Sequence, residues 1–205
     1  MIRGFDGSVF QNVIDWAAVK ASGLAQFAYA RASYGADYVD PDFARNHDVA
    51  RERDIPIGSY HFWLYDQSPQ SQFAKFLELT AKAGRLGTLL PMVDVEEGSF
   101  TAVPAVADVI SALRAVIDPI KAAAGPKPIL LYTNYDTWQR FFANTSAFND
   151  CLLWLAQTED PADGLYGGWS KFAIWQDGTT EIPGITGAVD YDTLAPGLTL
   201  ADIAR

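Results

Sequence analysis

The feature that most constrains this chain is a regular alternation between short apolar runs and longer stretches with helical periodicity. The apolar runs are rich in β-branched and aromatic residues, which favour buried strands, whereas the stretches between them repeat apolar residues every three or four positions. This alternation is typical of βα units around a buried, largely parallel sheet. The sequence therefore predicts an α/β fold, either a closed barrel or a doubly wound sheet.

The apolar runs predict eight strands, at Ile2 to Asp6, Phe27 to Ala32, Ile55 to Phe62, Leu89 to Glu96, Ile129 to Thr133, Leu152 to Gln157, Phe172 to Gln176 and Ala188 to Leu194. Helices are expected at Ile14 to Ser22, Pro41 to Glu52, Pro69 to Ala83, Val103 to Ala124 and Thr137 to Ala143. After Gln157 the connections are rich in Gly, Pro and Asp, which favour turns. We expect an irregular TIM-like (β/α) barrel, with regular βα units in its first half and loop- or hairpin-connected strands in its second.

Length and charge exclude several classes of protein. The 205 residues, 49% of them hydrophobic, suffice for one core, so residues 1–205 are expected to form a single domain and a monomer. A formal net charge of -10 is the wrong sign for binding phosphates, so nucleic acid is not an expected partner. No apolar run reaches the roughly 18 residues that a membrane span needs, so no membrane partner is expected either.

The sequence also bears on export, on disulfide formation and on metal binding. Met1 to Asp6 lack the basic start and apolar core of a signal peptide, so we expect release by lysis, non-classical export or membership of a larger protein. The single cysteine, Cys151, excludes an internal disulfide and reads as a buried hydrophobe. His47 and His61 are too few and too far apart for a zinc site, and we expect neither a metal nor another cofactor.

Polar side chains stand at the ends of most predicted strands. Reactive groups of a β/α-barrel collect at the carboxyl ends of its strands, where the loops form the mouth. The expected catalytic residues are Asp6, Asp94, Glu96 and Asp190. The expected substrate-binding residues are Tyr34, Tyr60, His61, Tyr132, Trp175, Gln176 and Asp192.

Asp94 and Glu96 are two residues apart on one predicted strand, so the period-2 rule sends both side chains to the same face. Crowded carboxyls disfavour full ionisation, so one of the two should hold its proton well above the usual pKa of a free Glu while the other stays ionised. A glycosidase needs that division of labour. Glu96 lies nearer the mouth, and we assign it the acid role.

Asp6 and Asp190 come from the first and last strands, which are neighbours if the barrel closes. Both can then face Asp94 and Glu96 across a narrow bowl. Some alternatives remain open: either aspartate could serve a turn or a cap, and Asp190 competes with Asp192 on the same strand face. His61 is equally compatible with a core position, and the same holds for the large aromatic side chains Trp63, Trp154 and Trp175.

Short motifs follow one another along almost the whole chain: Gly4-Phe5-Asp6-Gly7-Ser8 with Gln11, Ile14-Asp15-Trp16, Asp40-Pro41-Asp42-Phe43, Gly58-Ser59-Tyr60-His61-Phe62, Asp94-Val95-Glu96, Leu131-Tyr132-Thr133, Leu153-Trp154-Leu155-Ala156, Trp175-Gln176 and Val189-Asp190-Tyr191-Asp192. In this order they resemble glycoside hydrolase family 25, the muramidases of bacteria, fungi and phages. An isolated D-x-E motif is a weak signal of family membership, but the ordered set of motifs is highly specific. Departures are small, such as Phe5 where the family usually has Ile or Val.

The resemblance implies hydrolysis of the β-1,4 bond between N-acetylmuramic acid and N-acetylglucosamine in peptidoglycan, without a cofactor. It implies Glu96 as general acid, surrounded by Asp6, Asp94 and Asp190, and an enzyme that acts on the bacterial cell wall. Because Asp94 stands beside Glu96 rather than on a facing wall, we expect it to orient the substrate's acetamido group, whose oxygen is then the nucleophile.

Two other functions compete with this interpretation. A metal-dependent barrel hydrolase would use Asp94, Glu96 and Asp190 to hold a hard cation such as Mg²⁺. Such a site commonly orients a phosphate, and the sequence offers no Gly-rich cradle or Lys/Arg cluster for one. A non-catalytic glycan-binding module would keep the aromatic residues but does not need four converging carboxylates.

Overall fold

The computed structural model describes residues 1–158 and 164–205, and within them eight strands close into a barrel. The strands are β1 (Arg3–Gly7), β2 (Phe27–Tyr34), β4 (Ile57–Phe62), β5 (Met92–Asp94), β6 (Leu130–Thr133), β7 (Leu152–Ala156), β8 (Ile174–Glu181) and β9 (Ala188–Leu194). Their order is β1-β9-β8-β7-β6-β5-β4-β2, and a further pairing of β1 with β2 closes the ring. A two-residue strand, β3 (Tyr38–Val39), pairs antiparallel with the last two residues of β2, Ser33 and Tyr34.

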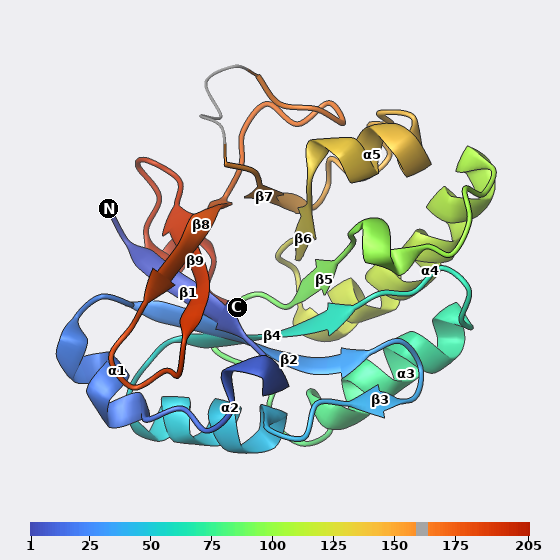
Figure 1. Cartoon of the computed structure of the whole chain (residues 1–205). Coiled ribbons are helices and arrows are strands. Elements are labelled where there is room, and N and C mark those ends of the chain that lie inside the picture. The colour runs from blue at the N-terminus through green and yellow to red at the C-terminus, as the bar shows by residue number, and fades with distance from the viewer. Residues whose placement is uncertain (159–163) are drawn as a thin grey trace.

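The direction of the strands divides the barrel into two parts (Figure 1). Neighbours from β1 through β2, β4, β5, β6 and β7 to β8 run parallel, whereas β9 runs antiparallel to both β8 and β1. Helices lie outside the parallel part: α1 (Trp16–Ser22), α2 (Phe43–Glu52), α3 (Pro69–Leu79), α4 (Val106–Ala124) and α5 (Tyr135–Phe142). The last two strands form a hairpin. The predicted irregular β/α-barrel is therefore confirmed.

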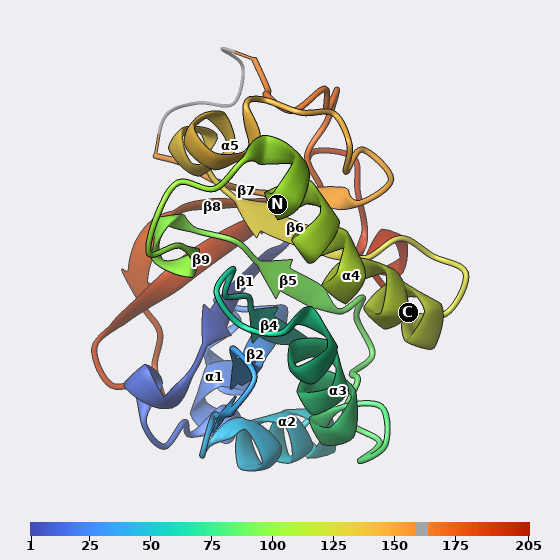
Figure 2. The ribbon, with the colours of Figure 1, turned by 90° about the vertical axis from the view of Figure 1, so that its right-hand side faces the viewer.

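Local sequence explains where the helices begin and end. Asp15 caps α1 by accepting hydrogen bonds from two backbone N–H groups, and Gly23 ends the helix in the left-handed conformation with φ 66°. Ser68 caps α3 just before Pro69, which suits the first helical position because its missing N–H is not needed there. Figure 2 shows α3 and α4 packed side by side on one flank of the barrel. No helix within the described ranges is both long and apolar enough to cross a lipid bilayer.

Two hydrophobic clusters, one on each face of the barrel wall, hold the fold together. The larger lies between the strands and the helices, and the smaller fills the barrel interior. Inside, the Tyr29 ring packs edge-on against Trp154, with centroids 4.8 Å apart, and its hydroxyl donates to the Leu90 carbonyl. Gly58 makes room for this ring, because a Cβ there would meet Tyr29 at 2.1 Å. The middle of the barrel is therefore packed with side chains rather than open.

Most strands differ from their predicted bounds by one or two residues at an end, β5 and β8 differ more, and one strand was not predicted. β5 ends at Asp94 rather than Glu96, because the chain turns into the 3-10 segment Glu97–Ser99. β8 extends to Glu181, five residues beyond its predicted end, because the ladder with β9 continues past a bulge between Gln176 and Gly178. β3 was not predicted, since two residues carry no readable periodicity.

Candidate active site

A pocket of about 200 Å³ opens at the mouth of the barrel, at the carboxyl ends of the parallel strands. It is lined by residues from seven strands and from the segments that follow β1 and β5: Asp6, Gly7, Ser8, Phe10, Gln11, Arg31, Tyr60, Phe62, Met92, Asp94, Glu96, Tyr132, Gln176 and Asp190. Four of these residues are carboxylic acids. All four predicted catalytic residues therefore meet in one pocket.

Strand pairing explains how the four carboxyls converge. Asp6 on β1 and Asp190 on β9 are direct partners in the antiparallel ladder, and Asp94 is the last residue of β5. Because β9 runs against its neighbours, the residues near its start, not its end, lie at the mouth. Asp190 thus lines the pocket, while Asp192 lies deeper and is fully buried.

Glu96 is held just beyond the end of β5. The Val95 N–H donates to the Tyr132 carbonyl at 3.0 Å, which continues the pairing with β6 past the end of the strand. The Glu96 backbone stays extended, with φ -127° and ψ 178°, and its N–H donates to Ser99 Oγ at 3.1 Å. The alternation expected of a strand therefore persists, and Asp94 and Glu96 both face the pocket.

Burial and mutual repulsion raise the pKa of every carboxyl in the pocket. Burial and the charge of Asp190 raise the pKa of Asp6 to about 7. Burial, then the charges of Glu96 and Asp6, raise the pKa of Asp94 well above its usual value. Burial and Asp190 raise the pKa of Glu96, a shift that a hydrogen bond with Tyr132 opposes. The site therefore favours a protonated carboxyl at neutral pH, as acid catalysis requires.

Arg31 on β2 is the cation that lines this pocket, and it is 9% exposed. Its Nε donates to Asp40 Oδ2 at 3.1 Å, and the same oxygen accepts the Val9 N–H at 2.9 Å. The Arg31 charge lowers the pKa values of Asp6 and Asp94 against the effects that raise them. Arg31 therefore favours an ionised carboxylate inside a cluster that otherwise retains protons.

A hydrogen-bonded path crosses the mouth from β6 to β1. The Tyr132 hydroxyl donates to Gln176 Oε1 at 2.7 Å, and Gln176 Nε2 donates to Asp6 Oδ2 at 2.9 Å. Beneath this path Asp192 Oδ1 accepts from Trp154 Nε1 at 3.2 Å. The side chains of Tyr132, Gln176 and Asp6 are thus held in place by one another as well as by their strands.

Residues 5–185 match the family described as glycosyl hydrolases family 25. The chain belongs to this family. It is 30% identical over 211 residues to the Escherichia coli strain K12 protein YegX, an alignment that covers 93% of this chain and 68% of YegX. It is also 26% identical to lysozyme M1 of Streptomyces globisporus, over 92% of this chain and 66% of that one. This family 25 chain is therefore a glycoside hydrolase.

Two solved structures support the assignment of this chain to family 25. The muramidase from Trichobolus zukalii is 25% identical and superposes with a TM-score of 0.81, over 97% of this chain and 95% of the other. The family 25 lysozyme from Aspergillus fumigatus is equally similar, at 25% identity and a TM-score of 0.82. The likeness extends over the whole barrel rather than over a shared fragment.

Several expected substrate-binding residues of the hydrolase do lie at the pocket. Tyr60, Tyr132 and Gln176 line it directly. Tyr34 lies beside it, with its ring stacked at 4.6 Å on Phe62, which is a lining residue. Asp192 does not reach the surface of the pocket, because it is fully buried below Asp190 and bonded to Trp154.

His61 and Trp175 lie on the other side of the barrel wall, which corrects the expectation that they bind substrate. His61 is fully buried, bonded to Ser33 Oγ at 2.9 Å and Gln72 Oε1 at 3.2 Å, and burial lowers its pKa to about 4. Trp175 packs on the outer cluster and donates to the Gln157 carbonyl at 2.8 Å. The period-2 rule accounts for both, since Tyr60 and Gln176, their chain neighbours, face inward.

Arg31 and Phe10 are among the pocket residues of the hydrolase that were not predicted. Arg31 alternates with Phe27 and Tyr29 on β2, so a lone cation at an inward position was the available signal. Phe10 carries no such signal, because it belongs to the 3-10 segment Val9–Gln11. Its ring is 75% exposed, and the Arg31 guanidinium lies 5.4 Å from the ring centroid.

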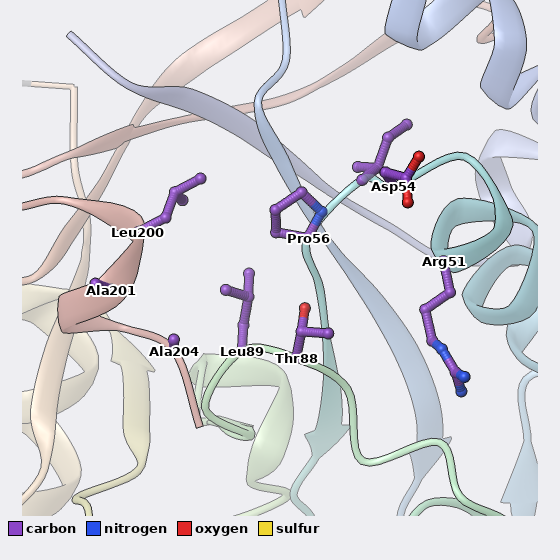
Figure 3. Close-up of a pocket in the computed structure, with 9 residues that line it drawn as sticks. Arg51, Asp54, Pro56, Thr88, Leu89, Leu200, Ala201 and Ala204 are labelled. Carbon is purple, nitrogen blue, oxygen red and sulfur yellow. The ribbon is translucent and has the colours of Figure 1, made fainter.

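A second hollow of about 410 Å³ lies at the opposite end of the barrel, near the starts of the parallel strands (Figure 3). Its labelled lining is mostly small or apolar: Arg51, Asp54, Pro56, Thr88, Leu89, Leu200, Ala201 and Ala204. It is larger than the carboxylate pocket, but it holds one acidic residue, so it lacks an acid–base pair. Within residues 1–158 and 164–205, no group of three or more His, Cys, Asp or Glu side chains is arranged to hold a metal ion.

Proposed function

We propose that this family 25 hydrolase is a muramidase that cuts the β-1,4 bond between N-acetylmuramic acid and N-acetylglucosamine in bacterial peptidoglycan. The observation that carries the proposal is the convergence of Asp6, Asp94, Glu96 and Asp190 in one pocket at the barrel mouth. The names of the relatives, a lysozyme and a muramidase, support the same substrate. The enzyme acts as a monomer on the cell wall and needs no cofactor.

Glu96 is the proton donor. It lies at the mouth, its carboxyl is partly buried, and its pKa is raised by burial and by the charge of Asp190. A raised pKa favours the protonated form of the carboxyl, which can transfer its proton to the glycosidic oxygen as the bond to the leaving sugar breaks. Glu96 then becomes a carboxylate that can activate water in the second step.

Asp94 is suited to hold the acetamido group of the sugar. Its Oδ1 atom is buried and has no hydrogen-bond partner among the described residues, so it needs a donor that the substrate can supply. The acetamido N–H is such a donor. Asp94 and Glu96 also project from one edge of the pocket, with Cβ atoms roughly 6 to 7 Å apart, so neither faces the other across the sugar ring.

These positions favour a substrate-assisted mechanism. Glu96 gives its proton to the glycosidic oxygen, the bond from the anomeric carbon to that oxygen breaks, and the acetamido oxygen bonds to the same carbon from the opposite face. Asp94 stabilises the positive charge that develops on the acetamido nitrogen. Water then attacks the anomeric carbon, returns one proton to Glu96 and restores the acetamido group, so the first product keeps the β configuration.

Asp6 and Asp190 form the rest of the electrostatic environment. Both carboxyls face the region where the sugar ring acquires positive charge, so their partial ionisation stabilises the transition state more than the ground state. Repulsion between the two carboxylates destabilises the folded protein, but the same negative charge stabilises the transition state.

Digestion of purified peptidoglycan tests the proposal directly. After digestion, the new reducing ends are reduced with borohydride, the glycan is hydrolysed, and the reduced amino sugars are identified. Reduced muramic acid is the expected product. Reduced glucosamine would identify a different bond, and the absence of any new reducing end would reject hydrolysis of this polymer.

A further inference from the structure

Arg31 lines the carboxylate pocket, but its own ion pair lies outside the catalytic cluster. Its side chain is largely buried and pairs with Asp40, which is buried and does not line the pocket. Among the described residues, no ion pair joins Arg31 to any of the four pocket carboxyls. Direct neutralisation of the catalytic acids therefore does not explain why this cation lines the pocket.

Asp40 holds the guanidinium by one nitrogen only. Arg31 Nε donates to Asp40 Oδ2 at 3.1 Å. Asp40 is itself held by the N–H groups of Val9 and Asp42, at 2.9 and 3.1 Å. Neither terminal nitrogen of Arg31 has a hydrogen-bond partner among the described residues, and neither is one of their buried unpartnered atoms, so both reach the pocket. The two NH₂ groups form the end of a planar fork that matches the two oxygens of a carboxylate.

Two exposed aromatic side chains flank this guanidinium at the mouth. Phe10 lines the pocket, and its ring centroid lies 5.4 Å from the guanidinium carbon. Tyr38, which pairs with the last residue of β2, lies at 5.8 Å from the same atom. Both rings are open to solvent rather than packed in the core, so each can receive the apolar face of a sugar. The site therefore suits a ligand that combines an anionic group with an apolar face.

Muramic acid is such a ligand, because it differs from glucosamine by a lactyl ether on carbon 3 that ends in a carboxyl group. Without a stem peptide this carboxyl is ionised at neutral pH. The other charged side chains that line the pocket are acids and repel it, so its binding needs a cation in direct contact. We propose that Arg31 is a specificity-determining residue, which binds the free lactyl carboxylate of muramic acid through its two terminal nitrogens.

The position of Arg31 agrees with the role proposed for Asp94. Arg31 pairs in register with Tyr60 on β4, and two residues further along β4 Phe62 pairs with Asp94 on β5. Arg31 is also close enough to lower the pKa of Asp94. The acetamido group that Asp94 holds is on carbon 2 of the sugar, next to the carbon that carries the lactyl group, so one sugar can reach both side chains. This inference rests on the proposed function, since it places muramic acid in the pocket.

Two soluble glycans that differ only at the lactyl group test the proposal. Both are made from peptidoglycan strands freed of stem peptides by an amidase, and in one of them the lactyl carboxyls are coupled to methylamine, which removes their charge. Wild-type kcat/KM should be about 10- to 100-fold higher for the carboxylate glycan, the factor expected of hydrogen bonds between charged groups. The methylamide keeps a carbonyl that accepts a hydrogen bond, so it should still be cut. Equal values for the two glycans would overturn the proposal without any variant.

For the variants, the readout is the ratio of these two kcat/KM values, because an effect of Arg31 on the catalytic carboxyls changes both alike. Arg31→Met should bring the ratio close to one. Arg31→Lys keeps a charge beside Asp40 but lacks the paired nitrogens, so it should lose most of the preference, and it carries the test if Arg31→Met does not fold. Arg140→Met is the matched control, since it removes a positive charge from an exposed side chain that binds Glu97, and it should keep the wild-type ratio.

The outcomes separate the ways in which the proposal can fail. A wild-type preference that both Arg31 variants lose and Arg140→Met keeps supports the proposal. A preference that the Arg31 variants keep, or that Arg140→Met loses equally, overturns it, because the anion is then recognised elsewhere or through the overall charge. If the wild-type enzyme releases reducing ends from neither glycan, the proposed function fails. Calorimetric binding of the two glycans to Glu96→Gln, with and without Arg31→Met, then still decides whether Arg31 binds the carboxylate.

Discussion

Asp6 and Asp190 are direct partners across the antiparallel ladder between β1 and β9, so two carboxyls stand side by side at the seam where the barrel closes. Like charges placed opposite one another on neighbouring strands destabilise a sheet. The pair is therefore a cost to folding that the active site imposes, because a strand pair chosen for stability would not combine two acids. Burial, together with this repulsion, raises the pKa of Asp6 to about 7 and prepares the cluster to hold a proton.

The first prediction concerns stability against pH. The pKa of Asp6 rises from 3.8 to about 7 on folding, so its contribution to stability is present below pH 3.8 and is lost as the pH rises toward 7. Asp6→Asn, which cannot ionise, should gain in unfolding free energy relative to wild type across that interval. Urea titrations at pH 4, 5.5 and 7.5 measure the difference. A difference that stays constant with pH would contradict the raised pKa.

The second prediction concerns the acid. Glu96→Gln keeps the size of the side chain but removes the transferable proton, so turnover should fall by about 10² to 10⁴ while the melting temperature stays nearly unchanged. Glu97→Gln is the matched control, since the Glu97 side chain is 73% exposed and bonds to Arg140 on the surface. Binding of peptidoglycan should persist in Glu96→Gln. Retained turnover would remove Glu96 from its role, and a wild-type protein that binds without turnover would indicate a glycan-binding module.

The third prediction separates carboxylate catalysis from a metal-dependent reaction. Two carboxyl groups and water suffice for glycoside hydrolysis, so activity should survive exhaustive treatment with a chelator and dialysis. The release of reducing ends is measured before and after treatment, and again after addition of Mg²⁺ or Mn²⁺. Inactivation that either ion reverses would favour the metal-dependent alternative.

The fourth prediction follows from the acetamido group as nucleophile. Peptidoglycan de-N-acetylated at muramic acid should be cut far more slowly than intact wall, even at saturating concentration, because the nucleophile is missing rather than merely bound less tightly. NMR of the first product, recorded before mutarotation, should show the β configuration. An α-configured first product would mean inversion and end the substrate-assisted mechanism.

Alternation along strands made much of this site predictable. Asp94 and Glu96 share a face because side chains alternate even where β5 has formally ended, and Asp6 meets Asp190 because the first and last strands close the barrel. The same alternation places His61 and Trp175 on the outer face of the barrel wall, because each is the chain neighbour of a residue that faces inward. A polar or aromatic residue at a strand end does not by its type alone reveal which face it occupies.

Other features were beyond local reasoning. The choice between Asp190 and Asp192 depends on the direction of β9, which a period-2 pattern does not reveal, since both residues lie on the same face. Phe10 belongs to a turn whose position is set by a distant contact, the Val9 N–H to Asp40. Such features depend on segments that are far apart in the chain, so they become visible only when the fold is known.

The closing of the ring by β1 and β9 also governs when this enzyme can become active during its synthesis. The hydrogen bond from Gln176 to Asp6 joins residues 170 positions apart, and Asp190 belongs to the last strand to be translated. At about 5 to 20 residues per second, the ribosome makes most of the helices and parallel strands before β9, the strand that completes the barrel, emerges. A nascent chain held before residue 188 has no β9, so it lacks one of its four pocket carboxyls and cannot seal its seam. The pocket is therefore complete only after β9 has emerged from the ribosome and paired with β1 and β8.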